Sequence, residues 1–146
     1  MKRQRLLIEE WLPAQAIGVE CGREHQLMAP FPAPVRLHVW WARRPLASAR
    51  AVLFASLVDD PSAHPDKFPT EEDQRVERKR LFDIIERLVP WEASNNDIVL
   101  ADARAEILKS CDGDLPKILD PFAGGGTIPL EALRLGLPSY AGDLNP

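Results

Sequence analysis

The stretch K-I-L-D-P-F-A-G-G-G-T-I-P-L-E-A-L-R-L-G-L-P-S-Y-A-G-D-L-N, residues 117–145, carries the strongest fold signal in the sequence. A short apolar run, Ile118-Leu119, ends at Asp120-Pro121, and three consecutive glycines follow. Apolar residues then recur at helical spacing up to Gly136, and a second short run leads to Asp143. This order of strand, glycine loop, helix, strand and acid is typical of a nucleotide-binding βαβ unit.

We expect Lys117–Leu119 and Ser139–Gly142 to form adjacent parallel strands, linked by a helix over about Thr127–Leu135. Glycines at the turn from strand to helix can adopt positive φ and leave room for a ligand to approach the backbone. The first N–H groups of the helix point toward the same place. Asp143, about 23 residues after Asp120, is placed to accept hydrogen bonds from the hydroxyls of a ribose.

Three explanations of the glycine loop fit its residues less well than a resemblance to a known family does. A dinucleotide site requires G-x-G-x-x-G, and Pro129 stands where the third glycine belongs, which disfavours an oxidoreductase half-domain. A phosphate loop requires a lysine after the glycines, and this chain has none there. The remaining interpretation is a turn that needs only flexible residues, but this would explain neither the residues around the glycines nor the acid at Asp143.

The residues around the glycines resemble the first motif of amino-group DNA methyltransferases, D-P-F-x-G-S/G-G-T. The matching residues are Asp120, Pro121, Phe122, Gly124, Gly125, Gly126 and Thr127. The resemblance implies an α/β fold, namely a partial Rossmann-like methyltransferase fold preceded by a helical N-terminal region. It also implies S-adenosylmethionine (AdoMet) as the cofactor, with Asp143 on its ribose.

Residues 36–57 form the second informative stretch, in which Pro45 is placed to be the first residue of a helix. Amino-methylating enzymes carry a segment H-P-T-x-K-P before the glycine strand, which lies against the methionine end of AdoMet. Arg44-Pro45 resembles its basic-proline core, whereas Trp40-Trp41 departs from its H-P-T. The resemblance implies that Trp40, Arg44 and Pro45 contribute to the cofactor pocket. The alternative for the two tryptophans is ordinary core packing.

Two runs at the start of the chain extend the resemblance. L-I-E-E-W-L-P (7–13) and H-V-W-W-A-R-R-P-L (38–46) are similar to an uncharacterised N-terminal domain fused to adenine-specific DNA methylases of bacteria and archaea. We therefore divide the chain into an N-terminal helical segment with the Trp-Arg-Pro motif (1–57), a charged helical insertion (58–116) and the first, incomplete βαβ unit of an AdoMet-binding domain (117–146).

Local signals predict the remaining elements. Residues 5–12 predict a short helix ended by Pro13, and a weak helical pattern follows it. The prolines of residues 28–35 predict an extended linker, and those of residues 59–69 predict a mobile loop.

The insertion predicts two helices. Thr70 with Asp73 predicts a capped start for a helix that stops at Pro90, and an asparagine at position 95 or 96 caps the next one. We expect both helices to pack on the edge of the sheet. The apolar stripe of the first helix consists of Val76, Leu81, Ile84, Ile85 and Leu88.

Base methylation in this family uses a motif of the kind (N/D/S)-P-P-(Y/F/W), which receives the amino group and stacks the extruded base. No Pro-Pro occurs in this sequence, so we assign no catalytic residue. We expect the chain to be the AdoMet-binding N-terminal portion of a methyltransferase that acts on an exocyclic base amino group, with adenine as the favoured base, and to be inactive alone. The catalytic motif and the contact with DNA are expected C-terminal to it. An unpaired sheet edge favours self-association or pairing with a C-terminal partner chain.

Composition limits the other classes of protein. The 146 residues are 45% hydrophobic and 27% charged, as in one globular domain, and no apolar run reaches the roughly 20 residues of a membrane helix. Cys21 and Cys111 have neither the spacing of a zinc site nor that of a disulfide framework, which predicts a reducing, cytoplasmic location. The net charge of −4 disfavours general binding to nucleic acid.

Positive charge nevertheless gathers in one window and predicts a local basic patch, made by Arg36, Arg43, Arg44 and Arg50. The alternative function is therefore a non-catalytic interaction module in which the glycine loop is a relic. Such a module would dock a partner protein or a nucleic-acid backbone through Trp40, Trp41, Arg43 and Arg44.

Overall fold

The computed structural model describes residues 5–26 and 43–144. The α-helices, in chain order, are α1 (Ala14–Gln26), α2 (Leu46–Leu57), α3 (Glu71–Leu88), α4 (Asp97–Ser110) and α5 (Thr127–Arg134). The described residues also form short 3₁₀ helices: η1 (Leu7–Glu9) before α1, η3 (Pro61–Ala63) between α2 and α3, and η4 (Trp91–Asn95) between α3 and α4. The strands are β1 (Ile118–Asp120) and β2 (Ser139–Ala141).

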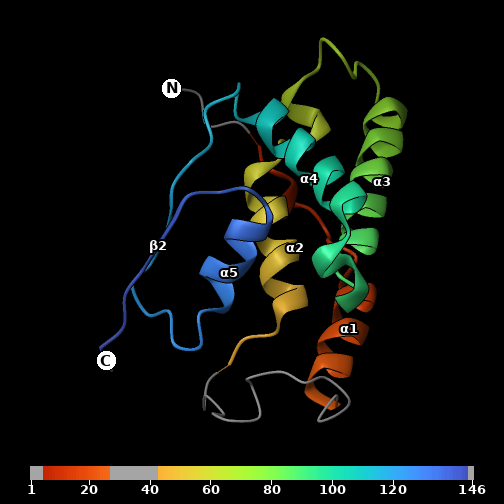
Figure 1. Cartoon of the computed structure of the whole chain (residues 1–146). Coiled ribbons are helices and arrows are strands. Elements are labelled where there is room, and N and C mark those ends of the chain that lie inside the picture. The colour runs from red at the N-terminus through yellow and green to blue at the C-terminus, as the bar shows by residue number, and fades with distance from the viewer. Residues whose placement is uncertain (1–4, 27–42, 145–146) are drawn as a thin grey trace.

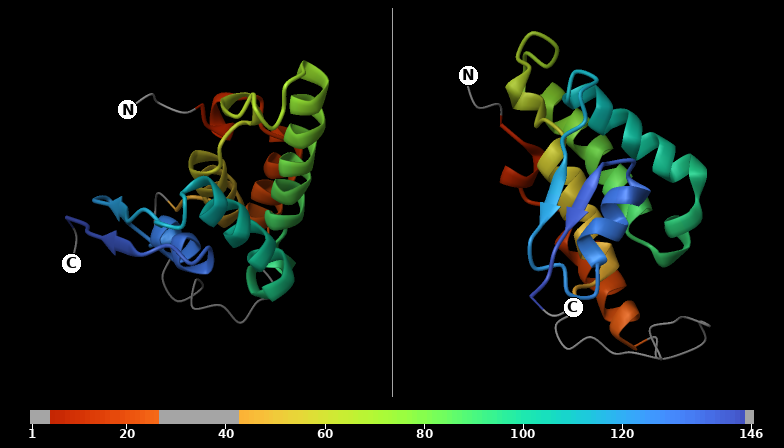
Figure 2. Two further views of the ribbon diagram at one scale, coloured as in Figure 1. Left: turned by 90° about the horizontal axis from the view of Figure 1, so that it is seen from above. Right: turned by 60° about the vertical axis from the view of Figure 1, so that its left-hand side comes forward.

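The two strands lie at one side of a mostly helical molecule, and α5 separates them from α2 (Figures 1 and 2). They pair in parallel, with Leu119 opposite Tyr140. The predicted order of strand, helix and parallel strand is thus confirmed, and the fold is a mixture of α and β elements. Within the described residues the sheet has two strands, and the larger Rossmann-like sheet stays a prediction.

The core is one apolar cluster, and α2 lies at its centre. This helix contacts α1, α3, α4 and α5. Its buried face is rich in alanine, with Ala47, Ala51 and Ala55 fully buried beside Phe54. Small side chains let neighbouring helices approach closely on several sides, because no long side chain stands between the backbones. The contacts of α2 therefore join the N-terminal half of the chain to the βαβ unit.

The predicted caps of α3 and α4 are confirmed. Thr70 and Asp73 form a reciprocal capping box at the start of α3, and the side chain of Asn96 accepts from the first amides of α4. Val76 was expected in the buried stripe of α3, but its side chain is 61% exposed. The expected packing on the sheet edge is also wrong in its main contacts, since α3 and α4 pack on each other and on α2, whose alanine-rich surface accommodates both.

The N-terminal segment is held by backbone pairing rather than by the helix expected over residues 5–12. Leu6 and Asp59 form an antiparallel bridge, and the N–H of Leu7 donates to the carbonyl of Val58 at 2.9 Å. This extended pairing leaves only the single turn η1, after which Pro13 precedes α1. The linker expected over residues 28–35 lies outside the described residues.

The stretch expected as a loop, residues 59–69, is anchored instead. Asp60 is fully buried, and Arg78 of α3 donates to its two carboxylate oxygens at 2.7 and 2.8 Å. Burial raises the pKa of the Asp60 carboxyl, but hydrogen bonds from Arg78 and Ser62 outweigh it and hold that pKa below its ordinary value. The ionised carboxylate of Asp60 therefore anchors residues 59–69 to α3 through Arg78.

Candidate ligand-binding site

The glycine loop turns sharply between β1 and α5. Gly124 has φ 50° and Gly126 has φ 76°, both in the left-handed region that favours glycine. The loop is closed by its own backbone, because the N–H of Gly126 donates to the carbonyl of Ala123 at 2.8 Å. Asp120 is buried at the end of β1, and its Oδ1 accepts from the N–H of Phe122 at 3.1 Å. The aspartate of the motif thus shapes the entry to the loop.

The acid predicted from its spacing lies against this loop. The N–H of Gly142 donates to the carbonyl of Asp120 at 2.9 Å, and Gly142 in turn accepts from the N–H of Ala123 at 2.9 Å. These bonds bring Asp143 alongside, and its Oδ2 accepts from the N–H of Gly124 at 2.7 Å. A carboxylate and the backbone of the glycine loop therefore meet at the carboxyl ends of both strands, where parallel α/β sheets bind ligands.

The Arg44-Pro45 segment meets the same turn. The hydroxyl of Thr127, the first residue of α5, donates to the carbonyl of Arg44 at 3.0 Å. Pro45 is the N-cap of α2, so the helix begins at Leu46, one position later than predicted. The two stretches that resemble methyltransferase motifs are thus in contact although they are far apart in the chain. The side chain of Arg44 is exposed beside them.

The carboxylate of Glu24, which no sequence pattern singled out, lies at the start of α2. Glu24, near the end of α1, accepts from the N–H groups of Leu46 and Ala47 at 2.7 and 2.8 Å. It thereby caps the first turn of α2 with a negative charge, which stabilises a helix N-terminus. The ends of several helices and strands lie toward the bottom of Figure 1. They are the C-terminal ends of α1, β1 and β2 and the N-terminal ends of α2 and α5.

The remaining predicted site residues differ in exposure. Thr127 is buried, whereas Phe122 is 74% exposed, and Pro121 and Gly125 are also exposed. Trp40, the other predicted pocket residue, lies outside the described residues. The structure brings the others together at the glycine loop and the start of α2.

Arg50 was expected in a basic surface patch, and this expectation is wrong. Its side chain is fully buried, and its Nε donates to Oε2 of Glu131, also fully buried, at 2.6 Å. Its other nitrogens donate to the carbonyl of Leu88 at 2.6 Å and to the hydroxyl of Ser94 at 2.8 Å. Arg134 donates to the second oxygen of Glu131. This network, which we call the Arg50 network, connects α2 with α5, the end of α3 and η4.

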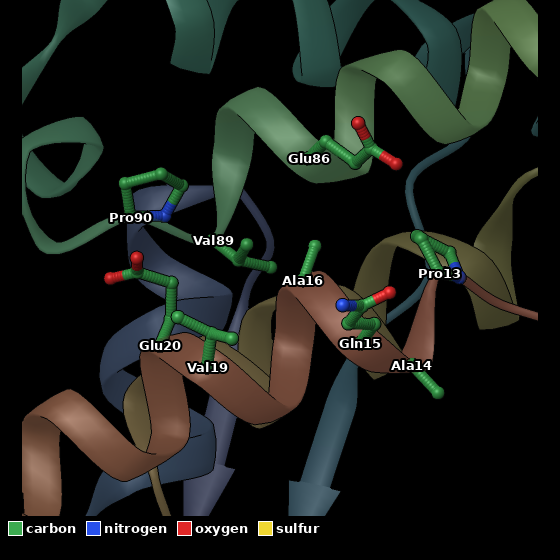
Figure 3. A pocket seen from close by; sticks show the side chains of 9 residues that line it. All are labelled: Pro13, Ala14, Gln15, Ala16, Val19, Glu20, Glu86, Val89 and Pro90. Atoms are coloured by element: carbon green, nitrogen blue, oxygen red, sulfur yellow. The ribbon is translucent and has the colours of Figure 1, made fainter.

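A groove on another side of the molecule does not involve the glycine loop. It runs between α1 and the C-terminal end of α3 and is shallow and open (Figure 3). Its lining is mostly small or apolar, with two glutamates, and consists of Pro13, Ala14, Gln15, Ala16, Val19, Glu20, Glu86, Val89 and Pro90.

In the described part of the chain, no group of three or more histidine, cysteine, aspartate or glutamate side chains is arranged to hold a metal ion. Burial, together with nearby acidic groups, raises the pKa of the Cys111 thiol, which disfavours the reactive thiolate. None of the described helices is long and apolar enough to cross a lipid bilayer.

Comparison with known families matches residues 11–84 to the family described as "Protein of unknown function (DUF1156)". The match covers just over half of the 146 residues. The chain belongs to this family. No curated protein and no solved structure matches the chain. The DUF1156 segment contains α1, α2 and most of α3, whereas the glycine loop and both strands follow it.

Proposed function

We propose that this chain is the AdoMet-binding N-terminal portion of a DNA methyltransferase that modifies an exocyclic base amino group, with adenine as the favoured base. One observation carries the proposal: the two motif-like stretches meet at the carboxyl ends of the strands. The hydroxyl of Thr127 donates to the carbonyl of Arg44 at 3.0 Å, and the carboxylate of Asp143 accepts from the N–H of Gly124 at 2.7 Å. A glycine loop that served only as a flexible turn would need neither contact.

The chemistry of the donor set fits AdoMet. The carboxylate of Asp143 is suited to the two hydroxyls of the ribose, because an ionised carboxylate accepts several hydrogen bonds at once. Gly126, the N-cap of α5, provides no side-chain cap, so the first amides of this helix can donate to a polar ligand. We assign the methionine part to the loop from Asp120 to Gly126 and to the Arg44-Pro45 segment, and the family resemblance adds Trp40 to this pocket.

The cofactor would supply a methyl group that its sulfonium already activates, so binding and orientation would be the main tasks of this chain. We assign no catalytic residue to it, because the sequence contains no Pro-Pro motif to receive the target base. Contact with DNA is assigned to a C-terminal part of the protein or to a partner chain. The DUF1156 segment would then be the N-terminal domain of a methylase, in a cytoplasmic protein.

The test is a calorimetric titration of AdoMet and, separately, NAD into the protein as its natural reading frame encodes it. We expect heat of binding for AdoMet and none for NAD. Tight binding of NAD without AdoMet would refute the proposal, because the loop would then serve a dinucleotide. If neither ligand binds, the interaction module becomes the better interpretation, with Arg43 and Arg44, both exposed, as its first residues to substitute.

A further inference from the structure

We propose that Arg50 is a positioning residue for the glycine loop. Through Glu131 it fixes α5 on α2, and α5 begins directly after the loop. The effect of Arg50 on AdoMet binding rests on the proposed function. Its effect on hydrogen exchange in the loop does not. By fixing α5, Arg50 would set the placement of the turn between Gly124 and Thr127, beyond any contribution to the stability of the whole fold.

The guanidinium of Arg50 admits one arrangement of its neighbours. Its nitrogens donate in three directions, to Glu131 of α5, to the carbonyl of Leu88 at the end of α3, and to Ser94 of η4. The group is planar and rigid, so these directions are fixed relative to one another. Because the side chain is fully buried, water cannot replace an acceptor that moves away. Glu131 therefore has one position relative to α2.

A second contact on the same face of α5 turns this position into an orientation. Thr127 and Glu131 are four residues apart, so both point toward α2 from one side of the helix. Thr127 donates to the carbonyl of Arg44, which lies just before α2, and Glu131 accepts from Arg50, which lies within that helix. Sliding α5 by one residue would displace it by about 1.5 Å and break the 2.6 Å bond between Arg50 and Glu131. The pair of contacts sets both the height and the rotation of α5.

The other end of α5 is held as well. Arg134 donates to the second oxygen of Glu131, and the carbonyl of Arg134 accepts from Nε of Arg104 of α4 at 2.9 Å. With both of its oxygens bound by arginines, Glu131 cannot rotate away from Arg50 without losing a partner. Because Arg104 holds the C-terminal end of α5 independently of Arg50, loss of Arg50 would mainly shift the N-terminal end of α5. The glycine loop lies at that N-terminal end.

Stability alone would not require this arrangement. Well-packed apolar residues often replace a buried ion pair without loss of stability, whereas an ion pair specifies one geometry among several. A fully buried arginine between α2 and α5 is thus better explained by the placement of α5 than by the strength of the core. This difference can be measured, because placement and global stability respond differently to substitution.

The experiment compares Arg50→Lys and Glu131→Gln with the control Arg78→Lys. Lysine keeps the charge of Arg50 but cannot reach three acceptors in fixed directions, and glutamine keeps the shape of Glu131. Arg78 also pairs with a fully buried carboxylate, that of Asp60, which caps η3 at the opposite end of the molecule from the glycine loop (Figure 1). The control therefore lowers stability without touching α5.

Hydrogen exchange at the amides of Gly124 and Gly126 is the readout that needs no ligand. We expect these amides to exchange about tenfold faster or more in Arg50→Lys and Glu131→Gln than in Arg78→Lys, compared under conditions of equal global stability. This factor corresponds to the loss of one hydrogen bond to a charged group. On the same proteins, the Kd for AdoMet should rise by about tenfold in the two network variants, as when a supporting partner of a binding group is removed, and should stay unchanged in the control.

Equal loop exchange in the network variants and the control would overturn the inference and leave Arg50 with a structural role only. If Arg50→Lys does not fold, Glu131→Gln decides the question by the same comparison. If the unmodified protein does not bind AdoMet, the proposed function fails, and loop exchange alone decides whether Arg50 positions the turn.

Discussion

Replacement of Gly126 by alanine tests whether the turn into α5 is left-handed. Gly126 is the N-cap of α5 with φ 76° and ψ 18°, and an added Cβ would meet no atom within 4 Å. Steric clash therefore contributes nothing, and the cost is that of a left-handed L-residue, roughly 1–2 kcal/mol. Alanine also restricts the unfolded chain, which offsets roughly 0.4–1 kcal/mol. We expect a net loss of about 1 kcal/mol in the free energy of unfolding.

The assay is urea denaturation followed by circular dichroism, with a thermal melt in parallel. In a chain of this size, a loss of about 1 kcal/mol lowers Tm by roughly 2–4 °C. Gly136→Ala is a matched control, because Gly136 also has φ 76° and its added Cβ would lie 3.6 Å from Cδ of Arg104, an ordinary contact. Both alanine variants should lose similar stability, but only Gly126→Ala should also weaken AdoMet binding.

A third variant separates backbone strain from other causes. Gly126→Asn should be more stable than Gly126→Ala, because asparagine visits the left-handed region more readily than other L-residues. If Gly126→Ala were as stable as the unmodified protein, or if asparagine were the worse substitute, the turn would not have the left-handed geometry from which the loss was calculated.

Three further predictions concern the acid, the anchored segment and the sheet. Asp143→Ala should weaken AdoMet binding by about 1–3 kcal/mol in a calorimetric titration, which is the range for losing charged hydrogen bonds. The control Asp66→Ala changes an exposed aspartate away from the loop and should leave AdoMet binding unchanged. Equal effects of the two variants would show that Asp143 is not part of the site. Because the pKa of Asp60 is lowered in the folded state, its contribution to stability is complete above the ordinary carboxyl pKa of about 4 and is lost as the pH falls through the lowered value. Urea denaturation between about pH 2 and 6 should therefore show a weaker acid-induced loss for Asp60→Asn, and identical pH profiles would contradict the pairing. Leu119 and Tyr140 pair across the sheet and are 72% and 57% exposed, so we expect them to promote self-association. Replacing both by lysine should shift the sedimentation of the protein toward that of the monomer. An unmodified protein that is monomeric at all concentrations would argue against this.

The elements that local chemistry determines could be predicted from the sequence. The glycines after Asp120 fixed the turn, and the apolar spacing after Thr127 fixed α5, because both signals act within a few residues. The capping box at Thr70 is likewise complete within one turn of helix. Asp143 lies just beyond the end of the second strand, as predicted, because the length of a βαβ unit constrains where that strand ends.

The contacts that join distant segments could not be predicted in this way. Arginine is almost never fully buried, so the composition around Arg50 favoured an exposed patch, and its partner Glu131 looked like an ordinary polar residue of an amphipathic helix. Glu24 caps a helix that begins more than 20 residues later, and no local pattern marks such a cap. Both pairings depend on how helices pack, which a single sequence read locally does not specify.

The Arg50 network also has a consequence for how the DUF1156 family can evolve. The family match ends at residue 84, and the groups that accept hydrogen bonds from Arg50 all follow that point, on Leu88, Pro90, Ser94 and Glu131. A gene fusion that replaced the downstream segment would leave an arginine in the core with no acid to neutralise it, a cost of about 3–5 kcal/mol. A different downstream segment would therefore keep α2 stable only if it supplied another acid for Arg50, or if the residue at position 50 changed with it.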